Sequence, residues 1–444
     1  MSIWIETKLK ESEIGKIPVD WSCTTLNKIA DINPKPIKLD SDDIEVSFVG
    51  MTDVSESAKL MNTTNRLYGE VKKGFTSFQD NDVLVAKITP CFENGKGALI
   101  YNLTNGIGFG STEFHVIRAK EQKGCPEFIH HITTTHNFRV KGEMNMTGTA
   151  GQKRVGKDFI ASYLIACPSF VEQQKIAEFL STVDKKIDLI DQKIAETEKL
   201  KTGLMQKLFS EGVGVQDENG NWQPHTEFQD SPFGKIPKCW SVETLGEHTI
   251  KVGSGVTPKG GSKAYVDTGI PLIRSQNVLF GKFKLDDVAF ITEQQHEKMK
   301  GSQLQPKDVL LNITGASIGR CAVLPADFEE GNVNQHVCII RMSQAITPEF
   351  CGWFLNSNLG QKQIWNLQAG GNREGLNFQQ IRSFRVPVLT VEEQCSIVEI
   401  LSTVSDKLNL LEQQKAETQQ LKKGLMQKLL TGEWRVPVEE TEAA

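Results

Sequence analysis

The chain contains one long segment twice, 221 residues apart. The first copy, LSTVDKKIDLIDQKIAETEKLKTGLMQKL, covers residues 180–208, and the second, LSTVSDKLNLLEQQKAETQQLKKGLMQKL, covers residues 401–429. From residue 178 to 208, 19 of 31 positions are identical to the second copy. Solenoid repeats have periods of roughly 20–50 residues. A period this much longer indicates a whole module copied end to end.

Shorter matching stretches precede each copy of the long segment, in the same order. They are GKIPVDW (15–21) and GKIPKCW (234–240), DVLVAKIT (82–89) and DVLLNIT (308–314), CPEF (125–128) and TPEF (347–350), and FVEQQKIAEFL (170–180) and TVEEQCSIVEIL (390–401). The stretches between them have diverged. Each module therefore pairs a variable globular part with a nearly constant helical part.

The long segment has the apolar spacing of a coiled-coil helix. Apolar residues recur at steps of three and four, with Thr197, Leu200, Lys415, Thr418 and Leu421 completing the two stripes. The predicted pairing residues are Val183, Ile187, Ile190, Ile194, Leu204 and Leu208 in one copy and Val404, Leu408, Leu411, Leu425 and Leu429 in the other. Such a stripe needs a partner. The spacing predicts an antiparallel intramolecular pair, and the alternative is that each helix packs on its own globular part.

The predicted fold class is α+β, with two mixed α/β domains and two long helices that form an intramolecular coiled coil with near two-fold symmetry. We predict a first domain at 1–168, a central helix at 169–212, a linker and second domain at 213–388, a C-terminal helix at 389–432 and a frayed acidic tail at 433–444. Predicted strands are 83–88, 97–101, 114–117, 309–313, 321–324 and 337–341. Residues 126–140 and 348–367 are each predicted to form one helix.

Composition limits the possible classes of protein. A formal net charge of −5 argues against indiscriminate binding to nucleic acid, so any surface that binds DNA must be a local patch. No apolar run is long enough to cross a bilayer, and the N-terminus does not resemble a signal peptide. The nine cysteines are scattered and form no CxxC pair, which fits a reducing compartment. We therefore expect a cytoplasmic protein.

Motifs for catalysis are missing or incomplete. NPKP (33–36) fails as the base-holding loop of an amino-methyltransferase, and GIGFGS (106–111) lacks a surrounding Rossmann unit. His130, His131 and His136 could suggest a metal site, but the matching stretch of the second module has no histidine. We expect exposed imidazoles there, no metal, no cofactor and no catalytic residue in this chain.

Glycine-interrupted polar loops are the remaining candidates for function. They supply Asn and Gln, which suit adenine edges, Arg and Lys, which suit guanine, and Ser and Thr, which suit either. In the first module the candidate DNA-binding residues are Lys87, Thr89, Asn94, Lys96, Lys153 and Arg154. In the second they are Thr257, Lys259, Arg274, Gln276, Asn277, Thr314, Ser317, Arg320, Asn334, Gln335, Asn372 and Arg373.

These patterns together resemble the specificity subunits of type I restriction–modification systems. The resemblance covers nearly the whole chain. It rests on the two G-x-I-P-x-x-W stretches, the G-x-T-P turn at 255–258, Gly269–Pro271, the Asn334–Gln335 pair, and the Glu-Gln that opens each long helix (Glu172, Gln173; Glu393, Gln394). The first globular part lacks the G-x-T-P and Asn-Gln stretches.

The resemblance implies two target recognition domains that each read one half of a bipartite, asymmetric site in double-stranded DNA. The helices would set the spacing and dock two modification (methyltransferase) subunits, and restriction (motor–nuclease) subunits would join them in phage defence. S-adenosylmethionine, ATP and Mg would be used by those partners. Two other hypotheses stay open, namely an enzyme that modifies DNA unaided and a coiled-coil scaffold without a role on nucleic acid.

Overall fold

A computed structural model describes residues 8–149, 151–258, 260–368 and 375–437. The chain divides into two compact units. Unit 1 comprises residues 1–192 and 413–444, and unit 2 comprises residues 193–412. Among the described residues, the helices that are long enough to cross a membrane are too polar to do so.

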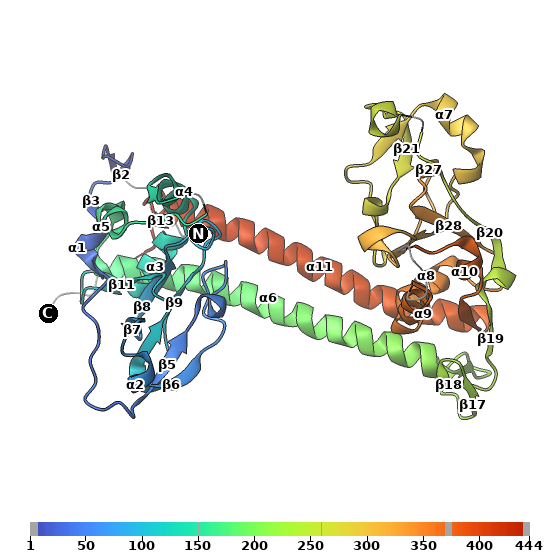
Figure 1. Ribbon diagram of the computed structural model, residues 1–444, viewed down its shortest axis with the longest axis horizontal. Helices are drawn as coiled ribbons and strands as arrows, with labels where there is room; N and C mark the ends of the chain where they lie inside the picture. Colours follow the sequence, from blue (N-terminus) through green and yellow to red (C-terminus); the bar gives the residue numbers. More distant parts are fainter. Residues whose placement is uncertain (1–7, 150, 259, 369–374, 438–444) are drawn as a thin grey trace. The chain divides into compact units, whose positions relative to one another are not determined.

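Unit 1 is built on two four-stranded sheets (Figure 1). The first is antiparallel, in the order β4 (Ala30–Ile32), β11 (Phe114–Ala119), β8 (Asp82–Ala86) and β9 (Gly97–Leu99). The second has the order β6 (Thr64–Leu67), β5 (Glu45–Val49), β10 (Ile107–Gly110) and β7 (Thr76–Gln79), and β5 and β10 are parallel. Strand pairs complete the unit: β1 (Leu9–Lys10) with β2 (Ile17–Pro18), β3 (Ser22–Thr25) with β14 (Leu164–Cys167), and β12 (Met146–Thr147) with β13 (Arg154–Val155).

Unit 2 repeats the first of these sheets. Its antiparallel order is β20 (Thr249–Ser254), β28 (Val337–Met342), β25 (Val309–Asn312) and β26 (Cys321–Val323). A second sheet contains β24 (Ala289–Ile291), β21 (Ile270–Ile273) and β27 (Asn332–Val333). The strand pairs are β22 (Val278–Leu279) with β23 (Lys282–Phe283), β19 (Ser241–Thr244) with β29 (Arg385–Val388), β15 (Val215–Gln216) with β16 (Trp222–Gln223), and β17 (Phe228–Ser231) with β18 (Gly234–Pro237). All six predicted strands are present, and each of their ends lies within two residues of the prediction.

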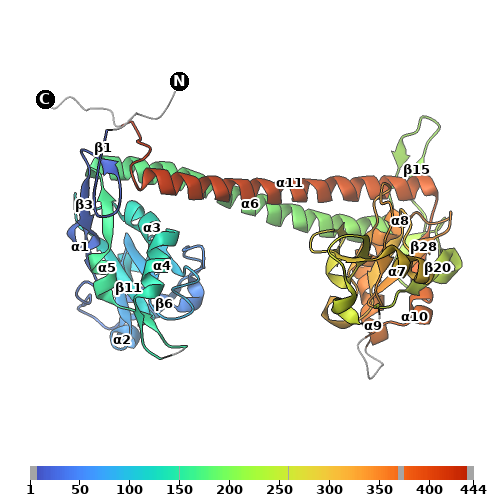
Figure 2. The same cartoon turned by 90° about the horizontal axis from the view of Figure 1, so that it is seen from above.

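Short helices cover the repeated sheets. In unit 1 these are α1 (Leu26–Ile29), α2 (Tyr68–Val71), α3 (Pro126–Thr134), α4 (His136–Met144) and α5 (Lys157–Ser162), and α3 packs on β8, β9 and β11 (Figure 2). In unit 2 they are α7 (Glu293–Lys298), α8 (Pro348–Asn356), α9 (Asn358–Gln368) and α10 (Phe378–Arg382), and α8 packs on β25 and β26.

The prediction of one helix at 126–140 and one at 348–367 was wrong. Each is two helices, because Thr135 and Ser357 adopt extended backbone conformations with ψ of 144° and 163°. Thr135 Oγ1 then accepts a hydrogen bond from Phe138 N and caps α4. Ser357 Oγ accepts from Gly360 N in the same way. A hydroxyl that satisfies a free amide at a helix start favours this break.

The two long helices are α6 (Phe170–Glu211) and α11 (Val391–Leu429). Within unit 1 they run antiparallel, because Lys415 pairs with Asp191 at 2.6 Å and Lys422 pairs with Asp184 at 2.6 Å. Within unit 2, Lys201 Nζ donates to Ser405 Oγ at 3.3 Å. The predicted pairing is confirmed inside each unit, and Lys415 occupies its stripe position through an ion pair.

The alternative packing also occurs. In unit 1, the start of α6 (Ile176, Leu180) and the end of α11 (Leu425, Leu429) belong to the same core as the globular strands. In unit 2, the end of α6 (Leu208) and the start of α11 join the globular core likewise. Each helix end therefore packs both on its helical partner and on a globular domain.

The predicted stripe is partly buried. Seven of its residues are buried, namely Ile187, Ile190, Leu208, Leu408, Leu411, Leu425 and Leu429. Four are half-buried, namely Val183, Ile194, Leu204 and Val404. The placement of Leu200 and Leu421 on the stripe was wrong, since they are 52% and 55% exposed. The heptad continues through Lys201 and Lys422, which are half-buried, so Leu200 and Leu421 lie one position off the stripe, while Thr197 and Thr418 remain inside.

Candidate nucleic-acid interface

Three polar loops of unit 1 meet beside the ends of β8 and β11. Lys87 N donates to Glu113 O at 2.9 Å, and Val155 N donates to Lys87 O at 2.9 Å. Thr89 N donates to Lys153 O at 3.0 Å. Loops that are far apart in sequence (87–97, 110–113 and 145–154) therefore share one hydrogen-bonded frame.

Unit 2 builds the same frame at matching positions. Ile313 N donates to His336 O at 3.0 Å, and Leu376 N donates to Ile313 O at 2.9 Å. Thr314 forms a β-bridge with Gly375, and Gly255 N donates to Asn334 O at 3.1 Å. The predicted loops of unit 2 are thus also brought together, on a backbone that repeats while its side chains differ.

The turn at Gly255 depends on glycine. A Cβ at this position would lie 1.6 Å from the backbone carbonyl oxygen of Val333. No side chain can be accommodated at that distance. The glycine of the G-x-T-P stretch is therefore needed for the approach of two loops.

In unit 1, Arg154 is already engaged. Its Nη2 donates to Glu113 Oε1 at 2.8 Å and its Nε to Glu113 Oε2 at 3.0 Å. The hydrogen bond from Arg154 lowers the pKa of Glu113, and the same bond raises the pKa of Arg154. The charge of Arg154 is therefore offset by a neighbouring carboxylate before any ligand binds.

The other predicted residues of unit 1 differ in availability. Thr89 Oγ1 donates to Glu93 Oε1 at 2.7 Å, Asn94 Nδ2 to Glu56 Oε1 at 2.9 Å, and Lys96 Nζ to Met51 O at 2.9 Å. Within the described ranges, the ammonium groups of Lys87 and Lys153 have no hydrogen-bond or ion-pair partner, and Lys153 is exposed. These two lysines are the available cations of the loops.

Several predicted residues of unit 2 hold turns together. Asn277 is fully buried, and its Oδ1 accepts from Arg274 N at 3.0 Å. Asn334 is also buried, and its Oδ1 accepts from His336 N at 3.0 Å. Arg274 Nη2 and Gln276 Nε2 both donate to Asp287 O, at 2.8 and 3.1 Å. Asn277 and Asn334 shape the loops, and both side-chain ends of Asn277 are hydrogen-bonded, since its Nδ2 donates to Asp286 O at 3.2 Å.

The remaining residues of unit 2 lie on the accessible side of the frame. Thr257 hydrogen-bonds Gln335, which is exposed, and Thr314 Oγ1 lies 2.6 Å from His336 Nδ1. The side chains of Ser317 and Arg320 are half-buried and have no partner in the part of the chain that the structure describes. Lys259, Asn372 and Arg373 lie outside the described residues.

Sequence reasoning missed two side chains at the centre of the frames. Glu113 offsets the charge of Arg154, and His336 bridges Thr314 and Gln335, whose Nε2 lies 3.0 Å from His336 Nε2. Both lie in loops that the sequence singled out. The only available signal was their position next to the strand that each loop precedes.

The expectation of exposed imidazoles at His130, His131 and His136 holds for His136 and was wrong for the other two, since His130 is half-buried. The clearest case is His131. Its side chain is buried, neither ring nitrogen has a hydrogen-bond partner within the described residues, and burial lowers its pKa to about 3. It is therefore a neutral core residue. Its counterpart in unit 2 is Trp353.

The short stretches that occur in both modules form structural clamps. Trp21 Nε1 donates to Glu172 Oε2 at 3.0 Å in unit 1, and Trp240 Nε1 donates to Glu393 Oε2 at 2.9 Å in unit 2. These bonds join the G-x-I-P-x-x-W stretch to the start of the long helix. In unit 1, Arg435 donates to the same carboxylate at 2.8 Å and to Asp20 Oδ2 at 2.9 Å, so the expectation of a frayed tail from residue 433 was wrong at this residue.

The glutamine that follows each of these glutamates closes a second clamp. Gln173 Oε1 accepts from Cys125 N at 3.0 Å, and Gln394 Oε1 accepts from Thr347 N at 2.8 Å. Both amides thus fix the residue before α3 or α8. The repeated residues build the frame and leave the loops above it free to vary.

One cluster of acidic residues and a histidine has the composition of a metal site. Glu243, Glu247 and His248 lie together in unit 2. Hydrogen bonds account for the arrangement, because His248 Nε2 lies 2.8 Å from Glu243 Oε2 and Glu247 Oε2 accepts from Thr244 N at 2.9 Å. The cluster caps a short helical turn.

Comparisons with known proteins place both modules in one family. The family model described as "Type I restriction modification DNA specificity domain" matches residues 18–199 and again 237–420. The EcoAI specificity subunit of a type I restriction enzyme from Escherichia coli is 34% identical over 228 residues, which are 50% of this chain and 38% of that protein. The putative MjaX specificity subunit from Methanocaldococcus jannaschii is 23% identical over 443 residues, which are 98% of this chain and 99% of that protein.

The matched stretches span only 38% and 37% of the EcoAI and EcoEI subunits. Two solved structures share the fold over nearly the whole chain. A type I restriction–modification S subunit from M. genitalium has a TM-score of 0.56 at 16% identity and covers 96% of this chain and 99% of its own. A chain from a study of type I R-M complex assembly and conformational transition has a TM-score of 0.56 at 18% identity, covering 94% and 99%.

The family model covers both copies of the repeat, from the proline of each G-x-I-P-x-x-W stretch (Pro18 and Pro237) through most of each long helix. Its two matched segments contain both loop frames. The chain belongs to the family of type I restriction modification DNA specificity domain proteins.

Proposed function

We propose that this chain is the non-catalytic DNA-specificity subunit of a type I restriction–modification complex. The observation that carries the proposal is the loop frame, which occurs once in each unit with the same backbone bonds and different side chains. Two recognition domains with the same frame and different loop side chains suit an asymmetric, bipartite DNA site. The first recognition domain would be residues 1–168 and the second would be residues 213–388, with its linker.

The chemistry of the loops supports a division of labour. Lys87, Lys153 and Arg320 can contact phosphates, which positions a protein on DNA without reading sequence. Gln335, Thr314 and Ser317 offer donors and acceptors that suit base edges. Lys259, Asn372 and Arg373 belong to the same proposal.

The helices at 169–212 and 389–432 would dock two modification subunits and set the spacing between half-sites, and 433–444 would be a tail. Methylation with S-adenosylmethionine and cleavage with ATP and Mg would then belong to the modification and restriction subunits. The cytoplasm, where DNA and these partners meet, is the proposed location.

The test is the methylation motif of the assembled complex. Full-length chain is co-expressed with its modification subunits, and adenine methylation is mapped by sequencing of host DNA. Gln335→Ala in unit 2 should relax one half-site and leave the other unchanged. Lys153→Ala and Arg320→Ala should weaken binding with little change of motif, because their proposed contacts are to phosphate.

Control variants separate the effect of the loop residues from that of a general loss of positive charge. Lys28→Ala and Lys300→Ala each remove an exposed lysine outside the loops and should leave methylation unchanged. Transfer of a labelled methyl group by the chain alone would instead favour an unaided enzyme. Absence of DNA protection by the assembled complex would favour a scaffold.

A further inference from the structure

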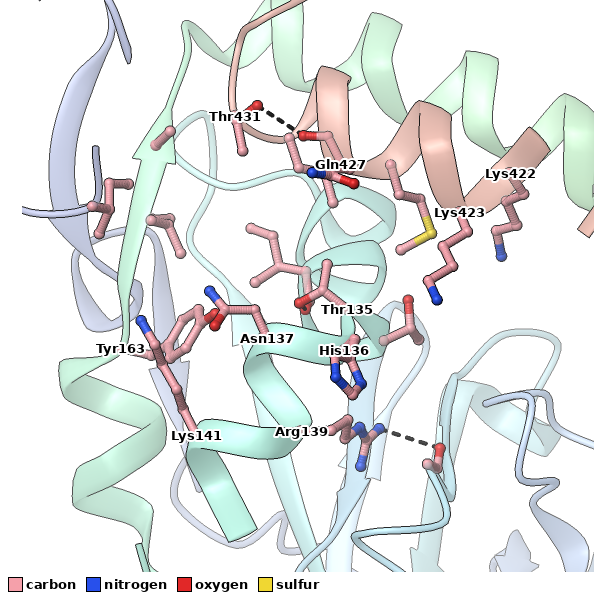
Figure 3. Close-up of a pocket in the computed structure, with 18 of the residues that line it drawn as sticks. Thr135, His136, Asn137, Arg139, Lys141, Tyr163, Lys422, Lys423, Gln427 and Thr431 are labelled. Atoms are coloured by element: carbon pink, nitrogen blue, oxygen red, sulfur yellow. Dashed lines mark hydrogen bonds between the residues drawn. The ribbon is translucent and has the colours of Figure 1, made fainter. Parts of the chain in front are cut away.

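Unit 1 contains a cavity of about 810 Å³ between α4, β14 and the last turns of α11 (Figure 3). This volume falls in the range of roughly 300–1,000 Å³ that is typical of pockets for small molecules. Figure 3 shows Lys422, Lys423 and Gln427 on one side and His136, Arg139 and Lys141 on the other. Glu93, Asn94 and Gly95 of the loop 87–97 form part of the lining, and the proposed function assigns no ligand to the cavity.

Unit 2 is an internal control, because aromatic side chains pack together at the matching place. Phe209 packs against Phe354 with ring centroids 5.5 Å apart, and Phe233 packs against Phe354 at 5.5 Å. Smaller residues occupy all three positions in unit 1, and all three line the cavity: Leu430 for Phe209, Ile132 for Phe354 and Ile14 for Phe233. Three rings of unit 2 are thus replaced by aliphatic side chains in the lining of the cavity.

The lining of the cavity is also more positive than its counterpart. Four lining positions gain a positive charge or lose a negative one: Arg139 for Gln361, Lys141 for Gln363, Lys423 for Thr202 and Gln419 for Glu198. Two positions change the other way, since Tyr163 stands where unit 2 has Arg385 and adds an aromatic ring to the wall, and Glu93 adds a carboxylate that the matching loop of unit 2 lacks. Enlargement and positive charge thus occur together in one unit.

Arg139 carries a buried charge without a carboxylate partner in the described ranges. Its guanidinium donates to Thr133 O, Phe92 O and Gly95 O at 2.9, 3.0 and 3.2 Å. Burial lowers its pKa to about 10. An anion beside this group would offset the cost of its burial.

Glu93 supplies a complementary unsatisfied group. It lines the cavity, and its Oε2 is buried without a hydrogen-bond partner among the described residues. A buried acceptor of this kind usually finds a donor. A hydroxyl or amino group of a ligand could provide it.

We propose that this cavity binds a nucleoside phosphate, with the phosphate held by Arg139 and Lys423 and the base or sugar against the aliphatic wall and Tyr163, beside which the Lys141 ammonium lies. The ligand class follows from three properties of the site, namely a cationic side, an aromatic and apolar wall, and an unpartnered acceptor. A free nucleotide and a nucleotide at the end of a DNA strand share this chemistry.

Bound ligand would touch the recognition loop of unit 1. Glu93 and Asn94 line the cavity and belong to the loop 87–97, and Arg139 holds the backbone of that loop at Phe92 and Gly95. Occupancy of the cavity is therefore coupled to the loop that carries Lys87 and Thr89.

The experiment is calorimetric titration of the full-length chain with ADP, adenosine and inorganic phosphate. ADP should bind with a stoichiometry of one and more tightly than adenosine or phosphate. Leu430→Phe restores the ring of unit 2 and should abolish binding. Lys423→Thr, the residue found in unit 2, should weaken ADP about tenfold, as expected for one charge-assisted hydrogen bond.

Matched controls lie outside the cavity. Leu421→Phe adds the same ring to an exposed position of α11, and Lys186→Thr removes an exposed lysine of α6. Both should leave ADP binding unchanged. Thermal unfolding of each variant checks the fold. If Leu430→Phe is unstable, Lys423→Thr still tests the site, because Lys423 is exposed and its replacement should not disturb the fold.

Three results would overturn the proposal: no saturable ADP binding, equal affinity in Lys423→Thr and the parent chain, or adenosine that binds as tightly as ADP. A short single-stranded oligonucleotide serves as competitor. Displacement of ADP would assign the site to the end of a strand, and lack of displacement would assign it to free nucleotide. These outcomes do not depend on the methylation test of the proposed function.

Discussion

The ion pair between Asp82 and Arg118 is predicted to hold the sheet that supports the unit 1 loops. The two residues are direct neighbours across β8 and β11, and Arg118 Nε and Nη2 donate to the carboxylate at 2.8 and 2.7 Å. Gln79 N donates to the same carboxylate at 2.8 Å. The Asp82 side chain is 1% exposed and that of Arg118 is 24% exposed.

Asp82→Ala removes all three hydrogen bonds and leaves the guanidinium without its partner. Breaking a buried pair costs about 3–5 kcal/mol, and the lower value applies because Arg118 keeps contact with water. The expected loss of stability in unit 1 is therefore about 3 kcal/mol. Asp82→Asn keeps the shape and one acceptor, so its cost should be smaller, about 1.5 kcal/mol.

Hydrogen exchange followed by mass spectrometry measures this effect locally. A loss of about 3 kcal/mol should speed exchange of the β8 and β11 amides by about a hundredfold. Unit 2 offers the matched variant, because Asp308 accepts from Arg341 Nε and Nη2 at 2.7 Å each. Asp308→Ala should speed exchange in β25 and β28 instead.

The reasoning would be refuted if Asp82→Ala left exchange in β8 and β11 unchanged. Equal acceleration in both units by either variant would refute the independence of the two cores.

Three further predictions concern other parts of the chain. Burial lowers the pKa of His131 from 6.5 to about 3, so the unfolded state binds a proton at this residue first as pH falls, and stability is lost from pH 6.5 downward. Between pH 7 and pH 5 this loss is about 2 kcal/mol. His131→Leu should remove it, as measured by urea unfolding at the two pH values. Leu421→Ser should change unfolding free energy by less than about 0.5 kcal/mol, whereas Leu425→Ala should cost about 2–4 kcal/mol in the same assay, because only the second side chain is buried. Glu113→Gln frees the guanidinium of Arg154, so the slope of log binding constant against log salt concentration for random duplex DNA should become steeper by about one. Lys153→Ala should make the same slope shallower by about one, as measured by fluorescence anisotropy. No change in either slope would argue against a phosphate-binding surface.

The repeat made the loop frame partly predictable. Strands β8, β11, β25 and β28 were found because each is an apolar run bounded by turn residues. The polar loops were found because glycines interrupt them in both modules. Sequence could not rank their side chains, since availability depends on neighbours from distant loops. Arg154 is offset by Glu113, which lies 41 residues away.

The short helices were predicted less well. Residues 126–140 have helical spacing throughout, and the break at Thr135 depends on one hydroxyl that can cap a new helix. Propensity differences at one position are small beside such a capping bond. Leu200 and Leu421 are apolar, but the heptad positions that follow Thr197 and Thr418 are Lys201 and Lys422, so both leucines are exposed beside the stripe.

The sequence by itself determined that the chain is a duplicated module, that each module ends in a long amphipathic helix, and which loops vary. Periodicity and self-similarity can be read from the order of the residues alone, without knowing which residues meet in space. Only the tertiary structure decided that Asn277 and Asn334 are buried turn residues, that Arg154 is paired, and that unit 1 has an open cationic cavity where aromatic rings pack in unit 2. Those facts depend on which side chains meet across space, and packing sets that through contacts far apart in the chain.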